Sequence, residues 1–437
     1  MSGRSTSTTP QALAVRALRA AQRPGAFSNR VLGELLERHD ELEPGARGLV
    51  TALVYGVLRH RARLDAHIDA HARDPGKLGA VPRELLRVAA YEVIELQRPL
   101  GNAVEHAIAA AREFDPSGRL GKLAHGILAA VAQDFTARDE AALAAPLRAL
   151  ELRWSVPRWL GGRWLKQLGP ERALQRARVL ADPPPVDLRI DLGRISADEA
   201  ATRLAEERPD ATLERVPDQP QALRVRGGGD LFYGLLHDEG LVSVQGLAAQ
   251  QPAIVLAPQP DERVLDACAG LGVKTLQLAE LMDRSGTIVA VDREPRQLAE
   301  HERLRARGRM DAASIVGDLA EPLPELDALA PFDAVLLDVP CTGLGNLARH
   351  PEIRWQRRFE DIAAAAALQS RLLARALVYL RPGGRLVYAV CSAEPEEGPA
   401  IVEAALAAGG ISCTHARLWT PEHDATEGFY VARLERA

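Results

Sequence analysis

The sequence has few cysteines and no long apolar run. Only four cysteines occur among its 437 residues, and none shows the C-x-x-C spacing of a zinc site, so we expect neither a disulfide framework nor a metal centre. The polar stretch 1–9 lacks the apolar core of a secretory signal, and no run approaches the roughly 18 apolar residues that span a membrane. These absences predict a cytoplasmic protein without a membrane partner.

Charge of either sign is also not in strong excess. The 54 Lys and Arg residues against 59 Asp and Glu give a formal net charge of −5, so a site for nucleic acid would have to be local. Glycine and proline occur at ordinary frequencies and no internal repeat is present, which excludes low-complexity scaffolds. A hydrophobic content of 47% over this length suffices for roughly three domains.

Three segments with different patterns follow one another. Between 10 and 135, apolar residues recur at intervals of three and four, which predicts an all-α bundle. The segment 150–240 predicts linker helices and a small α+β unit, because it alternates at 186–191 and is helical at 196–207. From 241 to 437, apolar strands alternate with helical stretches, which predicts a parallel, doubly wound α/β sheet of Rossmann type.

A glycine-bearing loop follows the first strand of the third segment. Such a loop lets the backbone approach a ligand at the carboxyl edge of the sheet, although it can also serve only helix packing. Asp292, which ends the second strand, can accept both hydroxyls of a ribose, and Asp318, after the third, can accept from an adenine amino group. Each aspartate could equally be a strand-end cap.

The pattern G-x-G-x-x-G is absent, and Lys274 suits a carboxylate better than a pyrophosphate. S-adenosylmethionine carries an adenine, a ribose and a carboxylate, so we predict it as the cofactor. The residues predicted to bind it are Cys268, Ala269, Gly270, Leu271, Gly272, Val273, Lys274, Asp292, Asp318 and Asp338.

Two cysteines follow the ends of adjacent strands. Cys341 comes after the strand that ends at Asp338, and Cys391 directly follows the next strand, so both thiols can face one pocket. Methylation of a pyrimidine at C5 needs such a pair, because a thiolate must first add at C6 and a second group must help remove the C5 proton. Asp338 can hydrogen-bond N3 and the exocyclic amine of cytosine. These three residues are therefore the predicted catalytic groups, and from their neighbours alone either thiol could be the nucleophile.

Four motifs closely resemble those of the RNA 5-methylcytosine methyltransferases of the NOP/Sun class: residues 266–275, 338–345, 390–392 and 427–434. The N-terminal helices look like the NusB-type RNA-binding bundle of the bacterial RsmB (Sun, Fmu) subgroup. The resemblance implies a class I methyltransferase domain acting on small-subunit ribosomal RNA. It also implies that Cys391 attacks cytosine C6, that Cys341 assists breakdown of the adduct, that Asp292 holds the ribose and Asp318 the adenine, and that the loop 268–274 holds the methionine end.

The chain departs from that family pattern at three places. Val273 stands where the family's cofactor loop has its second glycine, and because a β-branched residue rarely adopts positive φ, an altered local backbone is expected. Gly246 stands where an aspartate is usual. The segment 122–129 lacks the family's Asn-x-x-Leu-Arg pattern.

A basic segment follows the Cys341 loop directly. Phosphate pairing by arginine and stacking on an aromatic ring hold single-stranded RNA, so we predict RNA contacts here, although an ordinary solvated helix start would look similar. Two alternatives stay open: the same chemistry on tRNA, and a non-catalytic RNA-binding or assembly factor. We expect a monomer. The residues predicted to bind RNA are Arg349, Arg354, Trp355, Arg357 and Arg358.

Overall fold

The computed structural model describes residues 8–437 except 24, 230, 232–233 and 310. The described chain forms two compact units. The first comprises the described residues up to Pro183 together with Leu347–Arg357, and the second comprises the described residues of Pro184–Asn346 and Arg358–Ala437. The three predicted domain ranges, 10–135, 150–240 and 241–437, divide the chain more finely and stay a prediction.

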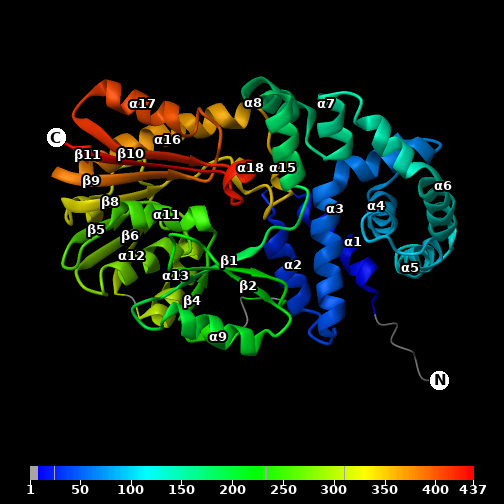
Figure 1. Ribbon diagram of the computed structural model, residues 1–437, viewed down its shortest axis with the longest axis horizontal. Coiled ribbons are helices and arrows are strands. Elements are labelled where there is room, and N and C mark those ends of the chain that lie inside the picture. The colour runs from blue at the N-terminus through cyan, green and yellow to red at the C-terminus, as the bar shows by residue number, and fades with distance from the viewer. Residues whose placement is uncertain (1–7, 24, 230, 232–233, 310) are drawn as a thin grey trace. The chain divides into compact units, whose positions relative to one another are not determined.

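The first unit is helical, as the sequence predicted (Figure 1). Its first six α-helices bury their apolar residues in a single core. At the start of the first helix the Thr9 side chain accepts from the backbone N–H of Ala12, which caps the helix. The helices are α1 (Pro10–Ala21), α2 (Ser28–Glu37), α3 (Pro44–His71), α4 (Ala80–Ile94), α5 (Leu100–Arg112), α6 (Arg119–Ala142), α7 (Pro146–Arg148), α8 (Arg158–Val179) and α15 (Ile353–Gln356), with shorter turns at Pro75–Lys77 and Ala149–Arg153.

Helix α3 is kinked at His60. In a regular helix the N–H of Arg63 would donate to the carbonyl of Arg59. Here Arg63 N donates to Ser155 Oγ at 3.0 Å, and Arg59 O accepts instead from the guanidinium of Arg354 at 3.3 Å. Polar groups inserted into the helical hydrogen-bond ladder therefore account for the kink.

A small antiparallel sheet opens the second unit and confirms the predicted α+β segment. Its strand order is β2-β3-β1-β4, and its apolar face forms a separate core with the helix that follows the first strand. Ser196 caps that helix by accepting from the N–H of Glu199. The elements are β1 (Val186–Ile190), α9 (Ala197–Glu207), β2 (Thr212–Arg215), β3 (Ala222–Arg226), α10 (Leu235–Asp238) and β4 (Val242–Val244).

The rest of the second unit is built on a sheet of order β10-β11-β9-β8-β5-β6-β7. Strands β5 to β9 are parallel, as predicted. The sheet also contains β11, which runs antiparallel to β9 and β10, because the link 420–428 between β10 and β11 is too short for a crossover. The strands are β5 (Arg263–Asp266), β6 (Thr287–Asp292), β7 (Ala312–Val316), β8 (Phe332–Asp338), β9 (Leu380–Val390), β10 (Ile411–Trp419) and β11 (Phe429–Arg436).

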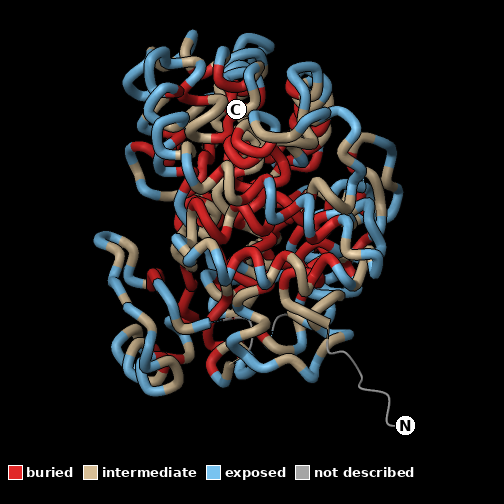
Figure 2. The backbone as a smooth tube through the Cα atoms, turned by 90° about the vertical axis from the view of Figure 1, so that its right-hand side faces the viewer, coloured by how far each residue is buried: buried red, intermediate tan, exposed pale blue. Residues whose placement is uncertain are grey.

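Helices cover both faces of this sheet (Figure 1). Alternate strand residues bury against opposite layers: Leu265 and Val335 on the side of α16 and α17, Val264 and Leu336 on the side of α11 and α12. Buried residues accordingly concentrate in the interior and exposed ones follow the outer loops and helix faces (Figure 2). The helices are α11 (Leu247–Leu256), α12 (Val273–Leu281), α13 (Pro295–Gly308), α14 (Pro324–Asp327), α16 (Glu360–Tyr379), α17 (Pro399–Ala408) and α18 (Pro421–Asp424), with a turn at Leu344–Asn346.

Among the described helices, α16 alone is long and apolar enough to cross a membrane by length and composition. Its buried residues Leu372, Leu373 and Ala376 belong to the core beneath the sheet. A helix that covers a sheet face needs an apolar stripe of this kind.

Candidate active site

The predicted site residues meet at the carboxyl ends of the parallel strands. The strand order reverses between β5 and β8, the kind of position where open α/β sheets bind ligands. Cys391 follows β9, Asp338 ends β8, the loop 268–274 follows β5, Asp292 ends β6 and Asp318 follows β7. The structure therefore brings the predicted catalytic and cofactor residues to one edge of the sheet, in the order in which the strands pair.

The two predicted catalytic thiols are in contact. The Sγ atoms of Cys341 and Cys391 lie 2.8 Å apart, and both cysteines are free and half-buried. The hydrogen bond to Cys391, burial, and the negative charge of Glu397 raise the pKa of the Cys341 thiol well above its usual value. Cys341 therefore keeps its proton at neutral pH and can donate it to the sulfur of Cys391.

Lys274 pairs with Asp338. Its Nζ donates to Asp338 Oδ2 at 2.6 Å and lies 5.7 Å from the centroid of the Phe429 ring. Burial lowers the pKa of Lys274, but the charges of Asp338 and Cys391 outweigh it and leave the pKa raised. A positive charge is therefore held next to Asp338 and Cys391, whereas the sequence suggested that Lys274 would face a ligand carboxylate.

The cofactor loop needs its glycines. Gly270 and Gly272 have φ of 57° and 87°, in the left-handed region. A Cβ on Gly272 would also lie 2.1 Å from Cδ2 of the buried His301. Val273, in contrast, begins helix α12 and is not among the described residues with positive φ. The expectation that the β-branched Val273 alters the loop backbone is therefore wrong, because this position needs only helical φ and ψ.

Asp292 and Asp318 cap the loops that follow their strands. Asp292 accepts from the backbone N–H of Gly270 at 2.8 Å and of Glu294 at 2.9 Å, and Asp318 accepts from Ala320 N at 2.9 Å. Each carboxylate oxygen retains a second lone pair for a ligand, so the cap and the binding role are compatible.

The thiol of Cys268 lies within the field of several carboxylates. Burial, followed by the charges of Asp266, Asp292 and the other strand-end aspartates, raises its pKa well above the usual value. Burial also raises the pKa of Asp266, to about 7, although a hydrogen bond from Thr275 Oγ1 opposes the shift. The negative charge of these aspartates favours a cationic ligand beside the cofactor loop.

The unusual Gly246 has a local explanation. It is the N-cap residue of α11 and has no side chain to accept from the first turn. Glu427 supplies the missing acceptor, since its Oε1 accepts from Ala249 N at 2.9 Å. A Cβ on Gly246 would lie 2.1 Å from that same oxygen, so glycine at this position and the glutamate of the C-terminal motif depend on each other.

One of the residues predicted to bind RNA, Arg354, is turned inward instead. Arg354 is only 2% exposed, and its guanidinium donates to the carbonyls of Arg59, Ser155, Leu180 and Leu347. Burial and the neighbouring Arg59 lower its pKa to about 9. Its predicted role in RNA binding is wrong for this conformation, because the side chain satisfies buried backbone acceptors and does not reach solvent.

The Trp355 ring is likewise occupied within the helical unit. Its Nε1 donates to the carbonyl of Leu58 at 2.7 Å, and the guanidinium of Arg61 lies 5.5 Å from the ring centroid. Because the residue is only half-buried, its role as a stacking platform for RNA stays a prediction. Of the other predicted residues, Arg358 is exposed, while Arg349 and Arg357 are half-buried.

Glu397 is a site residue that the sequence reasoning missed. It is fully buried and hydrogen-bonds the residue that follows each catalytic cysteine, Thr342 and Ser392. The sequence gives one signal for it, its position six residues after Cys391. Glu397 was missed because it lies in a run of glutamates, and such a run normally faces solvent.

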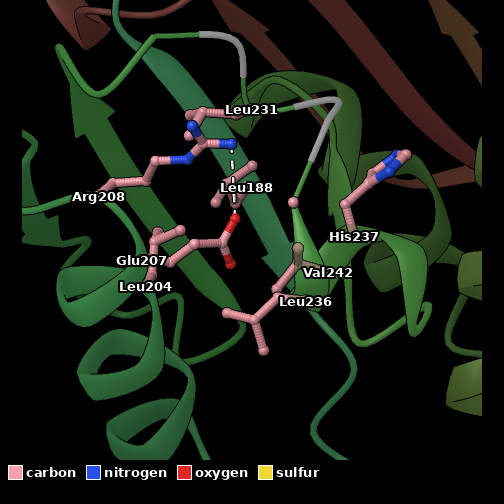
Figure 3. Close-up of a pocket in the computed structure, with 9 residues that line it drawn as sticks. Leu188, Leu204, Glu207, Arg208, Leu231, Leu236, His237 and Val242 are labelled. Carbon is pink, nitrogen blue, oxygen red and sulfur yellow. Dashed lines mark ion pairs between the residues drawn. The ribbon is translucent and has the colours of Figure 1, made fainter.

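A small pocket in the α+β segment is separate from this site (Figure 3). Leu188, Leu204 and Val242 form its apolar wall, and Glu207 pairs with Arg208 at 3.5 Å beside them. Its volume of about 10 Å³ leaves room for about one water molecule. None of the predicted site residues lines it.

Three families match successive parts of the chain. Residues 8–133 match the NusB family, residues 156–231 match the RsmF/B-like ferredoxin-like domain, and residues 253–435 match the family described as 16S rRNA methyltransferase RsmB/F. These matches follow one another in the order of the helical, α+β and α/β patterns of the sequence.

Curated relatives are similar over nearly the whole chain. The chain is 31% identical over 450 residues to the probable ribosomal RNA small subunit methyltransferase B of Synechocystis sp., covering 97% of this chain and 99% of that protein. It is 32% identical over 442 residues to ribosomal RNA small subunit methyltransferase B of Pseudomonas putida, covering 97% and 98%.

Solved structures share the fold. The crystal structure of PH0851 covers 98% of this chain and 99% of its own with a TM-score of 0.81 and 25% identity. The structure of NSun6 from Pyrococcus horikoshii with SFG covers 63% and 97% with a TM-score of 0.57 and 20% identity, which supports the fold alone.

Proposed function

Because this chain belongs to the RsmB family of 16S ribosomal RNA cytosine-C5 methyltransferases, we propose that it methylates a cytosine of 16S rRNA through a covalent adduct at C6 formed by Cys391. The observation that carries this proposal is the pair of free thiols 2.8 Å apart at adjacent strand ends, beside the carboxylate that ends β8. C5 of cytosine becomes nucleophilic only after a thiolate has added at C6. We further propose that the protein acts in the cytoplasm as a monomer.

The surroundings of the two thiols support different roles for them. The hydrogen bond to Cys391 and burial, with a smaller contribution from the charge of Glu397, raise the pKa of Cys341, and Lys274 places a positive charge near Cys391. As the family resemblance implies, Cys391 is the nucleophile in this proposal, and Cys341, which keeps its proton, is placed to assist breakdown of the adduct. Asp338 stabilises the ring by accepting from the exocyclic amine and, once N3 has been protonated after the addition at C6, from the N3–H.

The ends of β5, β6 and β7 fit S-adenosylmethionine, the methyl donor of this family. When bound, it supplies a methyl group on a positively charged sulfonium. The carboxylates whose charges act on Cys268 suit that charge. Gly272, which has no room for a Cβ, keeps the loop close to the start of α12, and Asp292 has lone pairs left for the ribose hydroxyls.

Replacing Asp292 by Ala should lower the affinity for S-adenosylmethionine at least tenfold. The substitution removes charge-assisted hydrogen bonds worth roughly 1.5–3 kcal/mol each and also frees the N–H of Gly270. Calorimetry measures the affinity. Asp261→Ala is the matched control, because that aspartate bonds Ser285 at the opposite ends of the strands. Unchanged affinity in the Asp292 variant would contradict the assigned cofactor site.

Replacing Arg354 or Arg358 by Ala should change different properties, stability in the first case and RNA binding in the second. Arg358→Ala removes an exposed charge, so the salt dependence of 16S rRNA binding should decrease by about one phosphate contact while the unfolding midpoint stays unchanged. Arg354→Ala leaves several buried carbonyls without their donor and should destabilise the helical unit by about 2–4 kcal/mol. Filter binding over a salt series and urea unfolding measure the two effects. The reverse pattern would restore Arg354 as an RNA contact.

The proposed activity is tested with purified protein, S-adenosylmethionine, unmethylated 16S rRNA and total tRNA. Bisulfite sequencing of each RNA after the reaction locates any 5-methylcytosine. We expect one protected cytosine in 16S rRNA and none in tRNA. Methylation confined to tRNA, or no methylation with the donor demonstrably bound, would refute the proposal.

A further inference from the structure

The carboxylate of Glu397 joins the two loops that carry the catalytic thiols. Its Oε1 accepts from the backbone N–H of Thr342 at 2.9 Å and from Gln369 Nε2 at 3.1 Å. Its Oε2 accepts from the hydroxyl of Thr342 and from that of Ser392, the latter at 2.7 Å. Thr342 follows Cys341 and Ser392 follows Cys391, so one side chain binds the residue next to each sulfur.

Two further contacts fix this arrangement in the fold. Tyr388 on β9 donates its hydroxyl to the backbone carbonyl of Glu397 at 2.6 Å. Gln369 on α16 donates to the carbonyl of Pro340 at 3.0 Å, immediately before Cys341. Glu397, Thr342, Gln369 and Ser392 are each 2% exposed or less. A buried, multiply bonded network of this kind holds its members in one geometry.

We propose that Glu397 is a positioning residue, whose carboxylate sets the separation of the two sulfurs by holding the residues that follow both cysteines. Its consequence for turnover rests on the proposed function, because the two thiols must then act on adjacent carbons of one pyrimidine ring. A misplacement of about 1 Å costs roughly 10²-fold in rate. The positioning itself requires neither RNA nor methyl donor and can be measured without them.

The groups that bond Glu397 allow a variant that keeps the hydrogen bonds of its side chain while removing its negative charge. Thr342 N and Gln369 Nε2 can only donate, and both meet Oε1. The two groups at Oε2 are hydroxyls, which can also accept. The amide of a Glu397→Gln variant can therefore keep its oxygen at the first position and donate to both hydroxyls from the second. We expect Glu397→Gln to preserve the positions of the loops and Glu397→Ala to lose them.

The first experiment measures how readily Cys341 and Cys391 form a disulfide in the full-length protein. In a glutathione redox buffer, two protein thiols and one oxidised glutathione give the protein disulfide and two reduced glutathiones, so the equilibrium reports the effective concentration of one thiol toward the other. We expect Glu397→Ala to lower that concentration at least tenfold and Glu397→Gln to keep it within about threefold. Glu396→Ala, which alters the exposed neighbouring carboxylate, should leave it unchanged.

A second set of variants guards against misfolding of Glu397→Ala. Thr342→Val and Ser392→Ala each remove one hydroxyl donor and keep the carboxylate, so each should lower the effective concentration by a smaller factor, with the unfolding midpoint recorded for every variant. An equal effective concentration in wild type, Glu397→Ala and the two hydroxyl variants would overturn the proposal. Rescue by Gln together with loss in Ala would establish it.

Turnover provides a separate measurement. If the proposed methylation is correct, Glu397→Ala should lower kcat by about 10²-fold with little change in KM, because the loops and not the RNA contacts are altered. A change in KM alone would contradict positioning. If no variant, wild type included, methylates RNA, the proposed function fails while the disulfide equilibrium still decides the role of Glu397.

Discussion

The Cys391→Ala variant is expected to lose both methylation and the covalent protein–RNA adduct. Without the thiolate no addition at C6 takes place, so C5 stays unreactive and nothing covalent forms. The loss of methylation should be complete within detection, because burial and the charge of Glu397 still raise the pKa of Cys341 in the absence of Cys391 and leave it a poor substitute. Denaturing electrophoresis with labelled 16S rRNA and S-adenosylmethionine measures the adduct, and methyl incorporation measures the activity.

The Cys341→Ala variant is expected to behave in the opposite way. Cys391 can still add to the base and the methyl group can still be transferred, but the group that assists breakdown of the adduct is missing. A covalent protein–RNA complex should therefore accumulate and survive denaturation. Its amount should approach one RNA molecule bound per active enzyme molecule.

Cys413 offers the matched control for both variants. It lies on β10, and its thiol donates to the carbonyl of His415 at 3.3 Å, outside the site. Cys413→Ala should keep full methylation and show no stable adduct. An adduct with Cys391→Ala and none with Cys341→Ala would exchange the roles assigned to the two thiols.

Replacing Asp338 by Ala should lower kcat by about 10²–10⁴-fold, the range typical of a lost acid–base or charge-stabilising group in the transition state. In the wild-type protein the Asp338 carboxylate stabilises the cytosine ring while the thiolate of Cys391 adds to C6. The substitution also leaves Lys274 without its partner, so its positive charge would meet the base directly. Single-turnover methylation of 16S rRNA measures the effect, and RNA affinity should change by less than the rate.

Two further variants test this reading of Asp338. Asp338→Asn keeps an oxygen for Lys274 but lacks the charge that stabilises a protonated ring, so its kcat should stay low. Asp333 lies on the same strand, where its carboxylate accepts from the backbone N–H of Arg263 and from the guanidinium of Arg381. The Asp333→Asn variant should therefore retain activity. A fully active Asp338→Asn variant would show that a neutral acceptor is sufficient and would remove charge stabilisation from the mechanism.

Much of the architecture was predictable because it depends on local periodicity. Apolar spacing gave the N-terminal helices and the strands β5 to β9, and residues that end parallel strands must share one edge of the sheet. The convergence of Cys341, Cys391 and Asp338 follows from this rule. The antiparallel β11 did not, since its direction depends on the short connection 420–428 and not on its own residues.

The sequence by itself determined the fold class, the family and the edge of the sheet on which the site residues gather, because hydrophobic period and motif spacing are local properties of the chain. Only the tertiary structure decided which polar side chains face inward. Arg354 looked like a surface cation and lies buried against four carbonyls, and Glu397 looked like part of a solvated run and holds both cysteine loops. A charged residue becomes buried when enough partners converge on it from distant parts of the chain, and no pattern of neighbouring residues records that convergence.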